Sequence, residues 1–167
     1  MGRAELLLVL AALSIFGWFS LTVNRSLLEN SSRVLESEFE ITAISLLQEV
    51  ISDAGLKAFD ENSVGVIPAS VPGGFTAVAD LGAETGETYP ILDDVDDFHG
   101  VTIIDTTGTN KQGWTYAIAC TVGYVTSSDL ENFSDSTTTL KRMNLILTSD
   151  YLPNDIRLSY VYSFVRE

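Results

Sequence analysis

Hydrophobic and polar positions divide the chain into three parts, of which the first is an uncharged apolar run. The run extends from Leu6 to Val23 and reads LLLVLAALSIFGWFSLTV, with its nearest charges at Glu5 and Arg25. As a helix these residues cover about 27 Å, which is close to the thickness of the hydrocarbon core of a bilayer. The pattern therefore predicts an apolar helix segment over residues 1–24 that packs against lipid or against copies of itself.

The same helix is expected to continue beyond the apolar run. From Trp18 through Ala54 the chain contains no glycine and no proline, and Gly55 stands where helices commonly end. Apolar residues recur at helical spacing in two neighbouring rows, which predicts an amphipathic helix over residues 25–55. We expect it to lie across a sheet from about Leu28 onward. The rows are Leu27, Val34, Ile41, Ile44, Leu47 and Ile51, and Leu28, Leu35, Phe39, Leu46, Val50 and Ala54.

Residues 56–167 are expected to form a β-rich globular domain, because the apolar pattern there changes to alternation. Polar loops separate the strongest segments, which is typical of an antiparallel meander. The amphipathic helix is the long apolar stripe that can cover such a sheet, so the sequence predicts an α+β fold. The expected strands are weak ones at 75–81 and 101–104 and stronger ones at 114–124, 142–148 and 156–164.

Composition excludes several classes of function. The chain has 9 basic and 23 acidic residues and a net charge of -14, which opposes binding to nucleic acid. Cys120 is the only cysteine and His99 the only histidine, so an intrachain disulfide and a Cys/His zinc site are excluded. The common nucleotide-binding, serine-hydrolase and zinc-protease motifs are missing. We therefore expect no enzymatic activity and no organic cofactor.

The densest polar cluster runs from Asp93 to Asp97. Carboxylates in a loop supply the oxygen ligands that calcium prefers, and Asp93, Asp96 and Asp97 are the best placed to share one ion. The spacing is not that of an EF-hand. A solvated acidic loop or a set of turn caps explains the same residues without calcium, so both interpretations stay open.

The N-terminal region resembles the type IV pilins and pseudopilins. The resemblance rests on a short N-terminus, a single glutamate at Glu5, the uncharged apolar run, and its uninterrupted helical continuation toward a β-rich domain. It covers about the first 55 residues. The chain departs from the family in having Met1 at the start, Arg3 beside the apolar run, no proline within the helix, and no C-terminal cysteine pair.

The resemblance implies a structural subunit of an extracellular type IV pilus-like filament, in which hydrophobic helices of identical subunits bundle at the centre. It implies processing by a prepilin peptidase, methylation of the amine of Met1, an inner-membrane pool before assembly by the pilus machinery, and a final place on the cell surface. In the family the glutamate offsets the terminal amine of a neighbouring subunit. The residues expected to act in filament assembly are Met1, Glu5, Leu6, Leu10, Leu13 and Gly17.

Two other functions remain open at this point. A minor pilin or a pseudopilin of a type II secretion system has the same helix and a comparable domain. A single-span membrane protein with an exported ligand- or protein-binding domain also has an apolar helix, but it needs no self-association.

Overall fold

The computed structural model describes residues 2–105 and 115–165. These residues form two compact units, Met1–Phe39 and Glu40–Glu167, and each is described by itself. A single α-helix, α1 (Arg3–Ala54), supplies the described secondary structure of the first unit and the first element of the second. The expected uninterrupted helix is therefore confirmed, and Gly17 causes no break in it.

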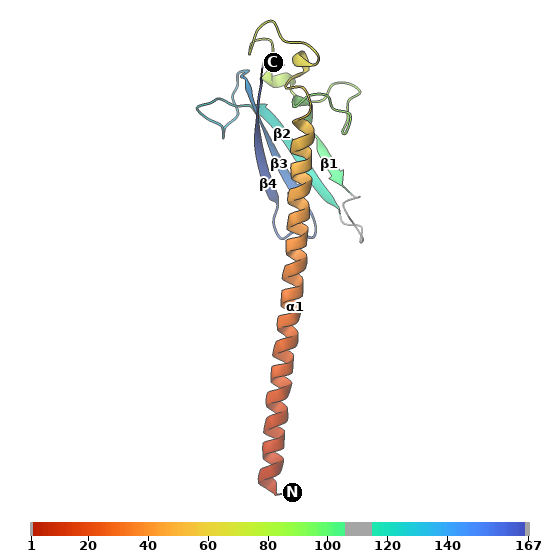
Figure 1. The fold of residues 1–167 in the computed structure, drawn as a ribbon, viewed down its shortest axis with the longest axis vertical. Helices are drawn as coiled ribbons and strands as arrows, with labels where there is room; N and C mark the ends of the chain where they lie inside the picture. Colours follow the sequence, from red (N-terminus) through yellow and green to blue (C-terminus); the bar gives the residue numbers. More distant parts are fainter. Residues whose placement is uncertain (1, 106–114, 166–167) are drawn as a thin grey trace. The chain divides into compact units, whose positions relative to one another are not determined.

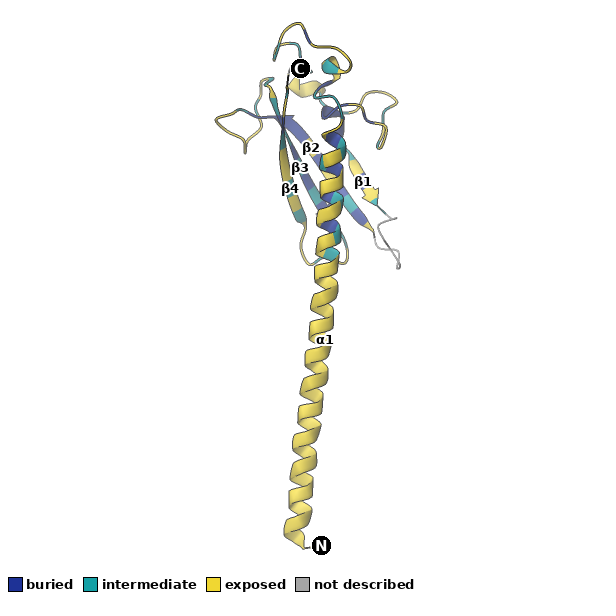
Figure 2. Ribbon diagram, in the orientation of Figure 1, coloured by how far each residue is buried: buried dark blue, intermediate teal, exposed yellow. Residues whose placement is uncertain are grey.

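In the first unit, every described residue before Phe39 is exposed (Figure 2). The exposed side chains include several leucines and the aromatic residues Phe16, Trp18 and Phe19. Trp18, for example, is 77% exposed. This part of α1 is long and apolar enough to cross a membrane, as judged by its length and composition. The chain thus carries a segment suited to a membrane anchor or a signal.

The second unit is built on an antiparallel sheet whose described strands follow one another in the order β1-β2-β3-β4. The strands are β1 (Thr102–Asp105), β2 (Tyr116–Tyr124), β3 (Leu140–Thr148) and β4 (Ile156–Ser163). The last part of α1 lies across one face of this sheet (Figure 1). The α+β arrangement and the meander predicted from the alternating pattern are both confirmed.

A narrow stripe on α1 packs into the core of the second unit. Its buried residues are Ala43, Leu47, Val50 and Ala54, which follow one another at helical spacing. They meet the inward-facing side chains of β2 and β3 in one hydrophobic cluster. These facing side chains are Tyr116, Ile118, Cys120, Val122, Met143, Leu145 and Leu147.

The buried stripe is shorter than the sequence predicted, and it combines Leu47 from one predicted row with Val50 and Ala54 from the other. The expected packing began near Leu28, but Leu28 is 63% exposed and the first buried residue is Ala43. Ala43 is buried because it lies one turn before Leu47 on the helix face that meets the sheet, whereas Ile41 and Ile44 lie on other faces and stay exposed.

The predicted strand at 75–81 is wrong. The connection between α1 and β1 contains short 3₁₀ helices in its place, η1 (Glu61–Ser63), η2 (Val78–Asp80) and η3 (Asp96–Phe98). The backbone of Thr76 does not pair with a strand, because its N–H donates to the carboxylate of Asp60 and its carbonyl accepts from the hydroxyl of Tyr124. Hydrogen bonds to side chains thus fix the backbone at Thr76. The alternation of apolar and polar residues in the sequence does not reveal such contacts.

Candidate functional site

The carboxylate of Glu5 caps the beginning of its own helix. Its Oε2 accepts a hydrogen bond from the backbone N–H of Gly2 at 3.0 Å, which satisfies one of the free donors of the first turn. A negative charge at this end of a helix is also favoured by the helix dipole. Met1, the predicted site of methylation, lies outside the described residues.

The other residues expected to act in filament assembly lie on the surface of the first unit. The side chains of Leu6, Leu10 and Leu13 are 55%, 52% and 62% exposed. A Cβ atom added at Gly17 meets nothing within 4 Å, so the helix surface is open there. Within the part of the chain that the structure describes, these residues have no packing partner outside their own helix.

The three predicted calcium ligands lie in three different settings. Asp93 is exposed and has carboxylate oxygens of Glu61 and Asp94 within 4.8 Å. Asp97 is buried and has Glu84 and Glu87 within the same distance. Asp96 forms an ion pair with a lysine of β3. The loop thus does not gather the three predicted side chains around one point.

The buried aspartates of this loop act on their own backbone. Oδ2 of Asp97 accepts hydrogen bonds from the N–H groups of Asp93 at 3.0 Å and Asp94 at 3.2 Å, and Oδ1 of Asp94 accepts one from the N–H of Asp97 at 3.0 Å. Turn capping, one of the two interpretations left open by the sequence, therefore accounts for these contacts. Among the described residues, Oδ2 of Asp94 is buried without a hydrogen-bond partner.

The main polar site of the second unit is a charged cluster in its core, which we call the Lys141 centre and define as Lys141, Asp60, Asp96 and Tyr124. The lysine side chain is 0% exposed. Its Nζ donates to Oδ1 of Asp96 at 2.6 Å, to Oδ2 of Asp60 at 2.8 Å and to the carbonyl of Phe59 at 2.9 Å. The rings of Phe59 and Tyr124 lie 4.8 and 5.0 Å from Nζ, within the range of cation–π attraction.

Asp60 is held in its charged form. Burial opposes ionisation, but the hydrogen bond and positive charge of Lys141 outweigh it and lower the pKa of Asp60 below its ordinary value. Its carboxylate also accepts from the hydroxyl of Tyr124 at 2.7 Å and from the N–H groups of Thr76 and Asn62. Burial, together with the hydrogen bond to Asp60, raises the pKa of Tyr124.

The pKa of Asp94, which stands two residues before Asp96, is shifted in the opposite direction from that of Asp60. Burial raises the pKa of Asp94 to about 9, with a further contribution from the charge of Asp96. At neutral pH its carboxyl group is therefore protonated. Asp94 and Asp96 are separated by one residue but lie in different electrostatic environments. Asp96 forms an ion pair with Lys141, whereas the pKa of Asp94 is raised by burial and by the charge of Asp96.

Sequence reasoning missed Lys141, although a signal was present. Lys141 stands two residues before Met143, in register with the inward-facing row of β3. In that register it lies opposite Tyr124 on β2 and Tyr162 on β4. A lysine on the buried face of a strand requires buried partners of opposite charge, but the alternation does not indicate which of the 23 acidic residues supply them.

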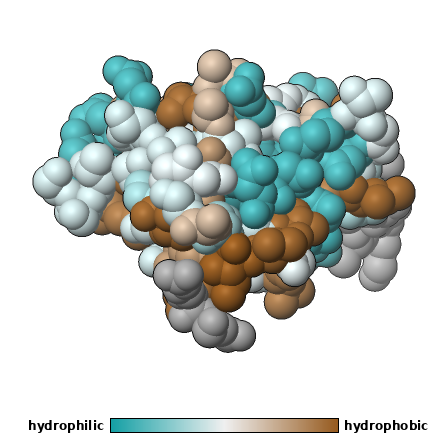
Figure 3. Space-filling view, turned by 90° about the horizontal axis from the view of Figure 1, so that it is seen from above, coloured by the Kyte–Doolittle hydropathy of each residue, from teal (hydrophilic) through white to brown (hydrophobic). Residues whose placement is uncertain are grey.

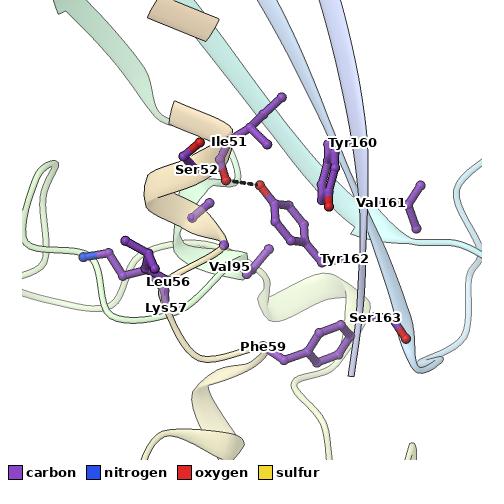
Figure 4. A pocket seen from close by; sticks show the side chains of 12 residues that line it. Ile51, Ser52, Leu56, Lys57, Phe59, Val95, Tyr160, Val161, Tyr162 and Ser163 are labelled. Atoms are coloured by element: carbon purple, nitrogen blue, oxygen red, sulfur yellow. Dashed lines mark hydrogen bonds between the residues drawn. The ribbon is translucent and has the colours of Figure 1, made fainter. Parts of the chain in front are cut away.

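A shallow groove of about 660 Å³ lies between the end of α1 and β4 (Figure 4). Tyr162 lies at its base, and its hydroxyl donates to the carbonyl of Ile51 at 2.8 Å. The ring of Tyr160 stands 4.8 Å from that of Tyr162. Lys57 also lines the groove, and its amine lies 3.8 Å from the carboxylate of Asp53.

The second unit also exposes apolar side chains. Leu56, Val66 and Ile91 keep 86%, 67% and 75% of their surface. Figure 3 shows one face of the molecule on which hydrophobic surface lies among hydrophilic side chains.

No family model, curated protein or solved structure matches this chain. Its function is therefore inferred from the apolar helix and from the chemistry of the globular unit themselves.

Proposed function

We propose that the chain is a structural subunit of a type IV pilus-like filament, assembled by bundling of its N-terminal helices. The observation that carries this proposal is the helix surface of the first unit, which is apolar, uncharged from Leu6 to Asn24, and exposed throughout its described part before Phe39. Such a surface requires either lipid or other helices around it.

The residues that follow the apolar run favour helices over lipid alone. Leu27, Leu28, Val34 and Leu35 lie beyond a membrane-spanning length, and they are 62%, 63%, 66% and 47% exposed. Lipid around Leu6 to Val23 does not reach these side chains. Packing against the helices of neighbouring subunits buries them, together with Leu6, Leu10 and Leu13.

In this proposal the subunit is held in the inner membrane and processed by a prepilin peptidase before assembly. It then becomes part of an extracellular filament in which the acidic second unit faces outward. Catalysis, nucleic acid and an organic cofactor have no part in it. Glu5 offsets the terminal amine of a neighbouring subunit once its local bond to Gly2 is exchanged for that contact.

Replacement of Glu5 tests the proposal. In cells that carry a pilus assembly system, Glu5→Ala is expected to reduce the yield of sheared filaments at least about tenfold while the chain still accumulates in the membrane. Glu36→Ala is the matched control, since Glu36 is an exposed glutamate of the same helix and is expected to leave the yield unchanged. Normal filaments from Glu5→Ala would remove Glu5 from the mechanism.

A single-span membrane protein with an exported domain is the second candidate. The specific observation in its favour is the bond from Gly2 to Glu5, which satisfies the carboxylate without any neighbour. Mass spectrometry of the mature N-terminus separates the two candidates. A methylated amine four residues before Glu5 supports the filament subunit, and an unmodified terminus on a chain that stays monomeric in mild detergent supports the anchor.

A further inference from the structure

The Lys141 centre places a primary amine against two carboxyl groups in the dry core of the second unit. Lys141 and Asp60 are both 0% exposed, and the side chain of Asp96 is 3% exposed. The amine comes from β3, Asp96 from η3, and Asp60 from the segment that follows α1. These three groups are far apart in sequence, and the fold of the chain brings them into contact.

We propose that Lys141 and Asp96 form an intramolecular amide bond, which cross-links β3 to η3. The side-chain nitrogen of Lys141 becomes bonded to Cγ of Asp96, and one water molecule is released. This inference is independent of the proposed filament, because it concerns the globular unit alone.

The geometry suits attack of the nitrogen on the carboxyl carbon. Nζ lies 2.6 Å from Oδ1 of Asp96, and a carbon–oxygen bond of about 1.2 Å therefore places Cγ within about 4 Å of the amine. Reacting atoms held this close in one molecule reach effective concentrations far above those of free reagents. The rings of Phe59 and Tyr124 restrict the position of the amine.

The atoms and charges of the reaction balance without an oxidant or a co-reactant. The ammonium of Lys141 has three protons, and the carboxylate of Asp96 has two oxygens. One proton passes to Asp96 to give a neutral amine and a neutral acid, the nitrogen bonds to Cγ, and a second proton from the nitrogen leaves with the departing oxygen. The products are a neutral amide and one water molecule.

Asp60 is placed to carry the second proton rather than to accept the bond. Its Oδ2 lies 2.8 Å from Nζ, within reach of a general base. Tyr124, Thr76 and Asn62 all donate to the carboxylate of Asp60 and stabilise its negative charge. A carboxylate whose negative charge is stabilised by several hydrogen-bond donors is a poor electrophile, so Asp96, and not Asp60, is the partner in the bond.

Burial favours the amide over the ion pair. Two separate charges are costly to keep in a core, whereas an amide is neutral, and the released water leaves a site from which solvent is excluded. The protonated carboxyl group of Asp94 adds no further negative charge at neutral pH. The amide bond also provides a covalent cross-link in a chain whose single cysteine cannot form an intrachain disulfide.

Peptide mapping of the purified full chain tests the proposal. Trypsin cleaves after Lys57, Lys111, Lys141 and Arg142, but not after a lysine whose amine is bonded. We expect peptide 58–111 joined to peptide 112–142, with a mass lower by one water than the sum of the two. Fragmentation of this species is expected to place the bond at Asp96.

Variants provide the controls. Lys141→Arg keeps a positive charge but has no primary amine, and is expected to give the two peptides separately. Asp93→Ala removes an exposed neighbouring aspartate and is expected to keep the link. The wild-type map decides the matter even if Lys141→Arg does not fold: complete recovery of unlinked 58–111 and 112–141, or a bond at Asp60, overturns the proposal.

Discussion

At the residue scale, the least expected feature is a fully buried lysine in a chain that has few basic residues. Lys141 is tolerated because two aspartates, a carbonyl group and two aromatic rings surround its amine. Each partner satisfies a charge that is costly when isolated in a core. The centre is therefore sensitive to the loss of any one member.

Replacing Lys141 by methionine is expected to destabilise the protein strongly. The change keeps a long apolar side chain but leaves Asp60 and Asp96 buried without a positive partner, which costs about 3 to 5 kcal/mol of unfolding free energy. Chemical denaturation of the full chain in detergent measures the loss. Lys57→Met is the control, because Lys57 pairs with Asp53 at a partly exposed site and its loss costs under about 1 kcal/mol.

Asp94 gives a prediction about pH. Its pKa is raised from 3.8 to about 9, so the folded protein keeps a proton that the unfolded chain loses. The resulting stabilisation is fully present below about pH 3.8 and is lost as the pH rises through about 9.

Asp94→Asn removes this titration while its amide oxygen still accepts from the N–H of Asp97. Between pH 4 and 8 the variant is expected to gain at least about 1.4 kcal/mol of unfolding free energy relative to the wild type, the equivalent of one pKa unit. Denaturation curves at both pH values measure the gain. Asp135→Asn, at an exposed site, is expected to follow the wild type, and an equal difference at both pH values would contradict the assignment to Asp94.

At the scale of the element, α1 serves two environments with one continuous hydrogen-bonded backbone. Its last part buries a stripe of small and branched residues against the sheet, whereas its first part exposes large apolar side chains. The two parts differ in what their leucines contribute, although the leucines look alike in sequence.

A matched pair of leucines separates these contributions. Leu47→Ala empties a site that is 0% exposed and is expected to cost about 2 to 5 kcal/mol of unfolding free energy. Leu27→Ala, at a site that is 62% exposed, is expected to change it by less than about 0.5 kcal/mol. Thermal and chemical unfolding of monomers in detergent compare them, and a similar loss from both changes would show that the first unit also contributes to the fold.

At the scale of the whole molecule, the apolar helix and the acidic domain have opposite requirements. The apolar helix has to be shielded from water by lipid or by other helices. In contrast, a net charge of -14 makes the chains repel one another unless a specific contact overcomes the repulsion. A filament meets both requirements when helices lie at its centre and the acidic units face water.

A charge placed beyond the membrane-spanning segment tests this arrangement. Val34→Glu is expected to reduce filament yield by more than about tenfold, because bundled helices bury this position and an unpaired charge there is costly. Ile104→Glu, on β1, is the control, since Ile104 is 64% exposed and Val34 is 66% exposed. Quantitative blotting of sheared filaments, with membrane-bound subunit as the reference, measures the effect. Equal yields from the two variants would favour the single-span anchor.

The sequence by itself determined the elements of this protein: the long helix without a breaker, the strands β1 to β4, and their antiparallel order. These follow from hydrophobic periodicity and from short polar turns, which are local properties of the chain. Tertiary structure decided the point at which α1 enters the core, the loss of the expected strand at 75–81, and the Lys141 centre. Lys141 meets partners 81 and 45 residues away, and only the fold of the backbone brings such distant side chains within hydrogen-bond distance.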